Sequence, residues 1–525
     1  MSEPVPAGDA ALAGLTHRDA DWSGLHVLVA GLGISGFAAA DALLERAAVV
    51  TVVDAVDPAA TGVVAERAQI LGALGAEVRL GPQHVVGVPA GTDLVIASPG
   101  WRPDQPLLAA AASTGTPVWA EVELAWRMRP RTGAAPWLTV TGTNGKTTTV
   151  HMLASILRAA GLRATSAGNV GTPLLEAVLH PEPYDVLAVE LSSAQLLWSS
   201  SISPLAAACL NIAPDHIDWH GSYAAYLAAK GRVYERTQVA CVYNVQDEAT
   251  ERLVERADVV EGCRAVGFTL GVPAPSMVGL VDDVLADRAF VEQRQTSAAE
   301  LGTLADLQAA TVPGAAAPHP VAPHYVANAL AAAALARAYG VPAVAVRDGL
   351  RAFVPDPHRI ADVAEVAGVR FVDDSKATNP HAAAASLAAF EPVVWVAGGL
   401  LKGAEVDSLV RSVATRLRAA VLIGADRERL ALALARHAPD VPVVDVASTE
   451  TDVMDLVVSH AVALAQPGDV VLLAPAAASW DMFTGYAARG DAFSAAVRRH
   501  AAGSAGSAGA AGAAGRPDDP GPAGP

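Results

Sequence analysis

Lysine is nearly missing from this chain of 525 residues, which has 36 lysines and arginines together but only four lysines. The four are Lys146, Lys230, Lys376 and Lys402, and each stands in a polar or glycine-rich stretch. Codon bias and chance are the alternative explanation. A lysine amine is a compact charge that can lose its proton, whereas a guanidinium stays charged. We therefore predict that these four positions serve chemistry.

Cysteine and long apolar runs are scarce too. The three cysteines, Cys209, Cys241 and Cys263, are far apart in sequence, so we expect free buried thiols and no disulfide or zinc framework. No stretch of about 18 apolar residues could span a membrane, and the N-terminus lacks the basic and apolar parts of a signal peptide. The net charge of −18 argues against nucleic acid as a partner. We expect a cytoplasmic protein with no membrane partner.

Short Val, Leu, Ile and Ala runs alternate with helix-length segments, a pattern that predicts parallel sheets covered by helices on both faces. The expected strands are the runs at 25–31, 49–54, 92–100, 137–142, 184–191, 205–212, 239–244, 369–375, 393–399, 419–425 and 469–476. Linkers rich in proline and glycine, near 129–136 and 354–360, separate three groups of runs. We predict an α/β protein with three domains, each with a mostly parallel sheet, at 22–133, 134–353 and 354–500. A leader at 1–21 and an Ala/Gly tail at 501–525 are expected to be disordered, and 311–324 to be a loop.

The segment TGTNGKTTT follows an expected strand and opens an expected helix. Its backbone N–H groups can hold phosphate there, with Lys146 on the distal phosphates and the Thr147 hydroxyl on a metal ion. Val140 stands where the full motif has glycine, and a chance Gly-Lys-Thr is the alternative, which the strand–loop–helix context disfavours. We predict a variant nucleotide loop made of Gly142, Thr143, Asn144, Gly145, Lys146, Thr147 and Thr148.

A second glycine turn, GLGISG, holds Gly31, Gly33 and Gly36 after an expected strand, and Asp54 ends the next strand. This spacing is typical of a dinucleotide fingerprint. Such a turn can bind any diphosphate, and a purely structural tight turn remains the alternative.

Acidic and histidine side chains follow the next strands of the central group. Glu190 ends one expected strand, where α/β sites gather, and His216 and His220 follow the next. A zinc site from the two histidines lacks a third ligand at suitable spacing. We favour one magnesium ion held by Thr147, Glu190 and His216 beside the phosphates, although an imidazole is an unusual ligand for it.

Segments DDSKATNP and AGGLLKG bring Lys376 and Lys402 to the ends of expected strands in the third group. APAAASWDMF adds Ser479, with Tyr486 nearby, and Arg359 is a candidate for binding phosphate or carboxylate through two hydrogen bonds. Ordinary solvated loops are the alternative.

Taken together, these motifs resemble the ATP-dependent Mur ligases of peptidoglycan synthesis over nearly all of residues 22–500. DDSKATN is typical of the member that adds D-glutamate to UDP-N-acetylmuramoyl-L-alanine. The resemblance implies a Rossmann-like UDP-binding domain, a central P-loop-type ATPase domain and a Rossmann-like domain that binds the amino acid. It implies ligation through an acyl phosphate with release of ADP and phosphate, and small-molecule substrates as partners. We expect a monomer.

The resemblance also implies a role for each site residue. The UDP substrate would be bound by Gly33, Ile34, Ser35, Gly36, Asp54, Asn169 and Ser192. ATP would be bound by the nucleotide loop with Asn328, Arg359 and Asp374. D-Glutamate would be bound by Lys376, Thr378, Lys402, Ser479 and Tyr486. Two Mg²⁺ ions would be held by Thr147, Glu190, His216 and Lys230, the last as a CO2-derived carbamate. The catalytic residues would be Lys146, Glu190, His216 and Lys230.

Two positions depart from the family's pattern: Tyr325 stands where an asparagine is frequent, and Leu400 where an aspartate occurs. The place of Tyr486 depends on counting through a loop. Three other functions remain open: another Mur ligase or a folylpolyglutamate synthase-like enzyme, a nicotinamide-dependent dehydrogenase built on GLGISG, and a binding protein without catalysis.

Overall fold

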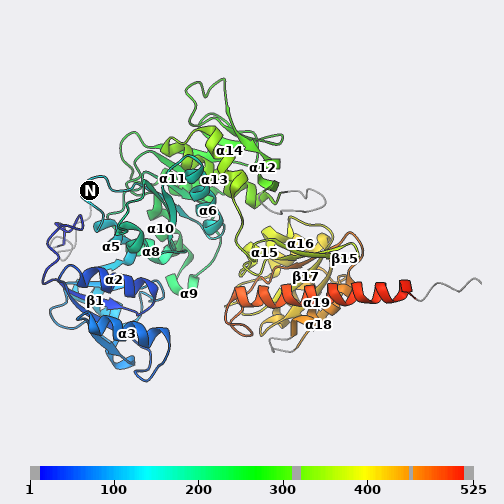
Figure 1. The fold of residues 1–525 in the computed structure, drawn as a ribbon, viewed down its shortest axis with the longest axis horizontal. Helices are drawn as coiled ribbons and strands as arrows, with labels where there is room; N and C mark the ends of the chain where they lie inside the picture. Colours follow the sequence, from blue (N-terminus) through cyan, green and yellow to red (C-terminus); the bar gives the residue numbers. More distant parts are fainter. Residues whose placement is uncertain (1–11, 310–320, 448–452, 514–525) are drawn as a thin grey trace, which may run out of the picture. The chain divides into compact units, whose positions relative to one another are not determined.

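The computed structural model describes residues 12–309, 321–447 and 453–513. The chain divides into two compact units, one within Met1–Ala310 and Tyr325–Phe353, the other within Thr311–His324 and Val354–Pro525. Unit 1 holds two sheets and unit 2 holds one, as the ribbon shows (Figure 1). The mostly parallel sheets and their helices confirm the predicted α/β fold class. The exact domain limits stay a prediction.

The first sheet of unit 1 has five parallel strands in the order β3-β2-β1-β4-β5. Its strands are β1 (His26–Ala30), β2 (Val49–Asp54), β3 (Glu77–Leu80), β4 (Leu94–Ala97) and β5 (Val118–Ala120). Its helices are α2 (Ile34–Leu44), α3 (Val63–Ala73), η1 (Pro82–His84), α4 (Pro106–Thr114) and α5 (Glu121–Arg127). The order reverses between β1 and β4, so the turn after β1 lies where such sheets bind ligands.

The second sheet of unit 1 has nine strands in the order β14-β13-β12-β11-β10-β9-β6-β8-β7, and only its pairs β12–β13 and β13–β14 are antiparallel. Its strands are β6 (Trp137–Thr141), β7 (Ala164–Gly168), β8 (Val186–Glu190), β9 (Ala206–Cys209), β10 (Ala240–Asn244), β11 (Arg264–Phe268), β12 (Met277–Val281), β13 (Val284–Asp287) and β14 (Ala299–Thr303). The strand β6, which leads into the nucleotide loop, lies between β8 and β9.

Helices surround this second sheet. They are α6 (Lys146–Ala159), α7 (Leu174–Val178), α8 (Ser193–Leu197), α9 (Ile217–His220), α10 (Tyr223–Gly231), η2 (Arg232–Tyr234), α11 (Glu248–Glu255), α12 (Leu304–Ala309), α13 (Pro323–Tyr339) and α14 (Ala343–Ala352). Helices α6 and α14 pack closely: a Cβ added at Gly349 would lie 2.3 Å from Ile156 Cα, and Ser155 Oγ donates to Gly349 O at 2.8 Å. Glycine therefore lets α14 pack directly on the helix that follows the nucleotide loop.

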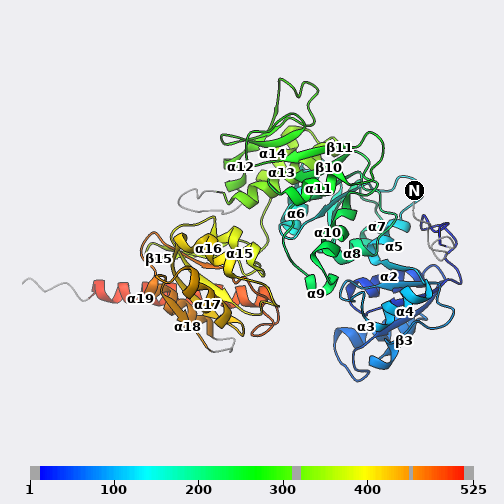
Figure 2. The same ribbon diagram turned by 180° about the vertical axis from the view of Figure 1, so that it is seen from behind.

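Unit 2 is a six-stranded sheet in the order β15-β16-β20-β17-β18-β19, and only β15–β16 is antiparallel. Its strands are β15 (Ala361–Val366), β16 (Val369–Asp373), β17 (Val393–Gly398), β18 (Leu417–Ile423), β19 (Val443–Asp445) and β20 (Val470–Leu473). Its helices are α15 (Pro380–Leu387), α16 (Asp407–Val413), η3 (Ala414–Arg416), α17 (Arg427–His437), α18 (Met454–Leu464) and α19 (Tyr486–Ala513). One core packs under α15, α16 and α17 and another under α18 and α19. Figure 2 labels these five helices.

The structure describes a part of each end that was expected to be disordered. Leu12 and Leu15 are buried in the first hydrophobic core, so the described part of the leader packs against the fold. Helix α19 continues to Ala513, because alanine has the highest helix propensity and dominates the start of the tail. Residues 1–11, 514–525 and most of the expected loop at 311–324 lie outside the described residues. None of the described helices is both long enough and apolar enough for a membrane span.

The three cysteines are free, as predicted, and two of them are buried. Two of them are close together in the fold although they are far apart in sequence: Cys241 Sγ and Cys263 Sγ lie 3.8 Å apart.

Candidate active site

The glycine turn after β1 is held by a hydrogen bond to Asp54, the last residue of β2. A Cβ at Gly36 would lie 1.9 Å from Gly31 O, so only glycine fits there. Asp54 Oδ2 accepts from Leu32 N at 2.7 Å, and Asp54 Oδ1 accepts from Val56 N at 3.1 Å. The carboxylate thus fixes the turn from which α2 starts. The structure therefore brings Asp54 beside the turn that carries Gly33, Ile34, Ser35 and Gly36, as the fingerprint spacing predicts.

The nucleotide loop ends at Gly145, whose φ of 85° favours glycine, and α6 starts at Lys146. Lys146 Nζ donates to Gly142 O at 2.9 Å and to Thr143 O at 3.0 Å. A Cβ at Gly145 would lie 2.4 Å from Asn328 Oδ1, so α13 brings Asn328 against the loop from far along the chain. The N-terminus of a fourteen-residue helix and a lysine amine therefore meet at one loop, an arrangement that suits phosphate.

Glu190 gathers two other predicted residues at the end of β8, where it is only 2% exposed. Thr147 Oγ1 donates to Glu190 Oε2 and Asn169 Nδ2 donates to Glu190 Oε1, both at 2.9 Å. The backbone N–H of Asn169 also donates to Glu190 O. A hydroxyl and a carboxylate beside a phosphate-binding loop are oxygen ligands of the kind that magnesium prefers.

Lys230 lies in α10 and is only 2% exposed. Its Nζ donates to Gly142 O at 2.8 Å, so the two lysines of unit 1 share one carbonyl acceptor. Burial, followed by the positive charge of Lys146, lowers the pKa of Lys230 to about 7. A buried amine of this kind is available in its neutral form near neutral pH, unlike an ordinary surface lysine.

Two predicted site residues of unit 1, His216 and Ser192, contact residues that were not predicted to belong to the site. The His216 side chain is 64% exposed, at the start of α9, with its Nε2 3.7 Å from Asp215 Oδ2. Ser192 caps α8, because its hydroxyl accepts from Gln195 N while Gln195 Oε1 accepts from Ser192 N. Across the described residues, no three His, Cys, Asp or Glu side chains gather as a metal site. Thr147 and Glu190 are the two predicted metal ligands that contact each other directly.

In unit 2, the residues predicted to bind the amino acid include two lysines, each of which lies over an aromatic ring. Lys376 Nζ lies 4.2 Å from the centre of the Tyr486 ring, so the residue reached by counting through a loop lies against one of these lysines. Lys402 Nζ lies 4.5 Å from the centre of the Trp480 ring, an exposed aromatic that the sequence did not single out. Ser479 is buried beside it. Thr378 follows in the same turn as Lys376, with its N–H donating to Lys376 O.

Asp374 and Arg359 lie at the start of the same unit. Burial raises the pKa of Asp374 to about 6, although hydrogen bonds from the Ser386 hydroxyl and the Ile360 N–H oppose that shift. Arg359 Nε donates to Asp356 Oδ2 at 3.3 Å. The Asp374 carboxyl is therefore held within the fold.

The two positions that depart from the family's pattern have different surroundings. Among the described residues, the buried Tyr325 hydroxyl has no hydrogen-bond partner, and burial raises the pKa of that phenol. The backbone of Leu400 pairs with Ala478 in both directions, at 2.8 and 2.9 Å, and so joins the AGGLLKG segment to the residue before Ser479.

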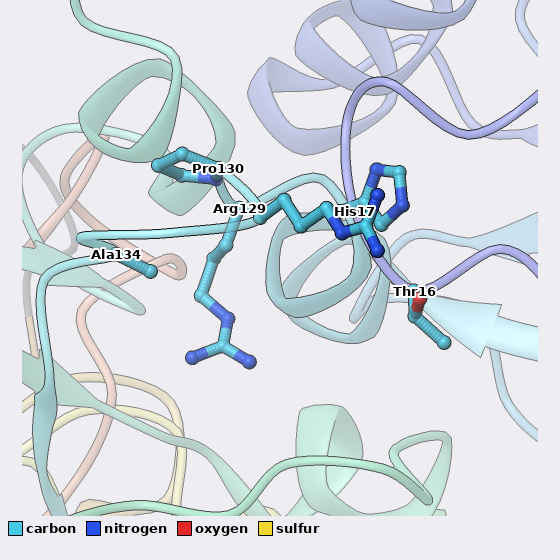
Figure 3. A pocket seen from close by; sticks show the side chains of 6 residues that line it. Thr16, His17, Arg129, Pro130 and Ala134 are labelled. Atoms are coloured by element: carbon cyan, nitrogen blue, oxygen red, sulfur yellow. The ribbon is translucent and has the colours of Figure 1, made fainter.

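One cavity lies away from all these residues (Figure 3). It has a volume of about 450 Å³ and lies at the linker between the two sheets of unit 1. Its lining residues are Thr16, His17, Arg129, Pro130, Arg131 and Ala134. Arg129 packs on the face of Trp126, which accounts for its place there without a ligand.

Comparison with known proteins gives consistent matches over both units. Residues 140–336 match the Mur ligase middle domain, and residues 358–477 match the Mur ligase glutamate ligase domain. UDP-N-acetylmuramoylalanine–D-glutamate ligase of Streptomyces avermitilis is 61% identical over 480 residues, which cover 91% of this chain and 99% of that protein. The enzyme of the same name from Leifsonia xyli is 52% identical and covers 95% of this chain and 97% of its own length.

A solved structure shows the same fold. The UDP-N-acetylmuramate–alanine ligase of Thermotoga maritima superposes with a TM-score of 0.53 at 19% identity, over 91% of this chain and 99% of that one.

Proposed function

This chain belongs to the Mur ligase family, and from that premise we propose that it joins D-glutamate to UDP-N-acetylmuramoyl-L-alanine with hydrolysis of ATP. It is an ATP-dependent, amide-bond-forming ligase of peptidoglycan-precursor synthesis. The observation that carries the proposal is the cluster of Lys146, Thr147, Glu190 and Lys230 around one nucleotide loop. A dehydrogenase built on GLGISG leaves that cluster without a use.

The nucleotide site follows from the loop. We assign ATP to residues 142–148 with Asn328, which contacts Gly145. The resemblance to the family adds Arg359 and Asp374 as ATP-binding residues. Lys146 faces the phosphates as a point charge, which lowers the repulsion when the alanyl carboxylate attacks the γ-phosphate. That attack forms an acyl phosphate and releases ADP.

Magnesium, when bound, neutralises phosphate charge during the transfer. Its ligands in this proposal are Thr147, Glu190, His216 and the carbamate of Lys230. The Thr147 hydroxyl and Glu190 carboxylate already meet at 2.9 Å, which suits a hard cation. The carbamate is supported by the burial of Lys230 and its place 2.8 Å from Gly142 O, because the modification needs a neutral amine beside the loop.

The UDP substrate and the amino acid bind to the remaining predicted residues. We assign the UDP part to the turn at 33–36 with Asp54, and the muramoyl part to Asn169 and Ser192. The D-glutamate amine attacks the acyl carbonyl and phosphate leaves, while Lys376, Thr378, Lys402, Ser479 and Tyr486 hold the amino acid. Both lysines supply charge to its carboxylates.

The division of labour among segments is part of the same proposal. Residues 22–133 bind the UDP substrate, 134–353 bind ATP, and 354–500 bind the amino acid. We place the enzyme in the cytoplasm with small-molecule substrates, because these substrates are charged and water-soluble. We expect it to act as a monomer.

Phosphate release tests the proposal. The protein is incubated with ATP, Mg²⁺ and UDP-N-acetylmuramoyl-L-alanine, together with D-glutamate, L-glutamate, L-alanine, glycine or a diamino acid. We expect release with D-glutamate only, and a product heavier than the acceptor by one glutamyl residue in mass spectrometry. Release with a different amino acid points to a sister ligase, and no release with D-glutamate refutes the proposal.

A further inference from the structure

Arg489 is a buried cation that none of the assigned roles uses. It lies in the first turn of α19 and is 1% exposed. Its Nε donates to Ser375 Oγ at 3.0 Å and its Nη2 to Ser375 O at 2.9 Å. Its Nη1 donates to Ala477 O at 3.1 Å and to Gly398 O at 3.4 Å. One guanidinium thus binds three separate segments of unit 2.

The acceptors are unusual for a buried charge. In the part of unit 2 that the structure describes, they are three carbonyls and one hydroxyl, and none is a carboxylate. Burial lowers the pKa of Arg489 to about 10, while the charges of Asp481 and Asp373 oppose that shift, so the side chain stays charged at neutral pH. A planar fork with five donors reaches several fixed acceptors at once, which a lysine cannot do.

The three segments are those that carry the predicted amino-acid site. Ser375 immediately precedes Lys376, Ala477 lies two residues before Ser479, and Gly398 ends β17 ahead of Lys402. Each segment follows the carboxyl end of a neighbouring strand: β16, β20 or β17.

Further contacts fix the same cluster. Ser375 Oγ donates to Tyr486 O at 2.7 Å, which ties the start of α19 to the first segment. A Cβ at Gly399 would lie 2.2 Å from Ala478 O and 3.3 Å from Arg489 Nη1. The backbone after β17 therefore passes close to both the guanidinium and the segment that contains Ala477.

We propose that Arg489 is a positioning residue for the amino-acid substrate, which holds the three segments so that Lys376, Lys402 and Ser479 face a single bound amino acid. The inference rests on the proposed function, because it takes D-glutamate as that amino acid. Arg489 touches no reacting atom and acts through the loops that it joins.

Arg489→Lys tests the inference, because it keeps the charge and removes the fork. We expect the KM for D-glutamate to rise about tenfold or more, since two or more charge-assisted hydrogen bonds are lost. The KM values for ATP and for the UDP substrate are expected to change less than about threefold, because their main contacts lie elsewhere. Ser375→Ala, which removes one acceptor, is expected to give a smaller rise of about two- to fivefold.

Arg418→Lys is the matched control. Arg418 forms two hydrogen bonds with Asp469, at 2.8 and 3.1 Å, at the amino ends of β18 and β20, away from the three segments. Its loss is expected to lower the Tm without changing the KM for D-glutamate.

The outcomes separate cleanly. A folded Arg489→Lys protein with an unchanged KM for D-glutamate, or with equal rises for all three substrates, overturns the inference. If that variant does not fold, Ser375→Ala decides on the same criterion. A wild-type protein that shows no turnover with D-glutamate refutes the proposed function, and with it this role, whereas an active wild type keeps the two questions apart.

Discussion

Lys230→Arg is the substitution that most sharply tests the proposed chemistry. The amine of Lys230 is buried beside Gly142 O and Lys146, and only a neutral amine can combine with CO2. Arginine keeps the positive charge but cannot be deprotonated in a protein. We expect the variant to fold and to lose about 10² to 10³ in kcat, the usual result when an oriented charged group of an active site is removed.

The lowered pKa determines what fraction of the Lys230 amines is neutral at a given pH. With a pKa of about 7 in place of the ordinary 10.5, about half of the Lys230 amines are neutral at pH 7, compared with about one in 3000 for an unshifted lysine. The neutral fraction is about one in ten at pH 6 and about nine in ten at pH 8. Activity in CO2-depleted buffer should therefore recover on addition of bicarbonate more fully at pH 8 than at pH 6.

The same pKa makes a separate prediction about stability. The folded pKa lies below the unfolded value, so the unfolded chain binds the extra proton between about pH 7 and pH 10.5. The free energy of unfolding contributed by this group therefore rises with pH across that window and is lowest below pH 7. Denaturant unfolding in CO2-free buffer should show this slope, and Lys230→Met should flatten it.

Phosphate release and carbon NMR with labelled bicarbonate are the assays. We expect a carbamate signal from the wild type and none from Lys230→Arg. Arg232→Lys, the reverse exchange two residues further on, is the control and is expected to keep its activity, because Arg232 binds only Leu197 O and Glu235 among the described residues. Near-normal turnover of Lys230→Arg would show that the carbamate assignment is wrong.

Two further predictions concern the nucleotide loop and its support. Lys146→Arg is expected to lower kcat by about 10² to 10³ with an unchanged Tm, because the larger planar group cannot fit against Gly142 O and the phosphates together; steady-state kinetics with thermal unfolding measures both, and retained kcat contradicts the assignment. Gly349→Ala is expected to destabilise the protein by about 1–3 kcal/mol, because its Cβ would lie 2.3 Å from Ile156 Cα. Urea unfolding measures this effect, and an unchanged midpoint would show that the helices can move apart.

The sequence was most informative where a motif is local. The segments from Gly142 to Thr147 and from Gly31 to Gly36 were both predicted to follow a strand, and each does so and runs into the first turn of a helix. These predictions succeeded because glycine conformation, helix start and strand end are set by neighbouring residues. The long apolar strands of each sheet, such as β17, were identified for the same reason.

Weakly apolar strands were missed. β3 reads EVRL and β7 reads ATSAG, and neither has the Val or Ile content that marks a buried parallel strand. The strands β12, β13 and β14 were missed as well, because each is placed by pairing with the strand before it in the chain and not by a local pattern.

Contacts between residues far apart in the chain also could not be predicted from the sequence. The resemblance suggested Asn328 as an ATP residue, but only the fold shows it against Gly145. Arg489 gave no signal at all, because one arginine among 32 looks like any other until its burial is known. Hydrogen bonds to main-chain carbonyls leave no trace in residue types.

That last property matters for how such enzymes diversify. Arg489 binds the carbonyls of Ser375, Gly398 and Ala477, so side chains around it can be exchanged without breaking the frame. Insertions and deletions in those segments are a different matter, since they would shift a carbonyl out of reach. Natural variants with altered amino-acid preference should therefore differ here in residue type and not in loop length.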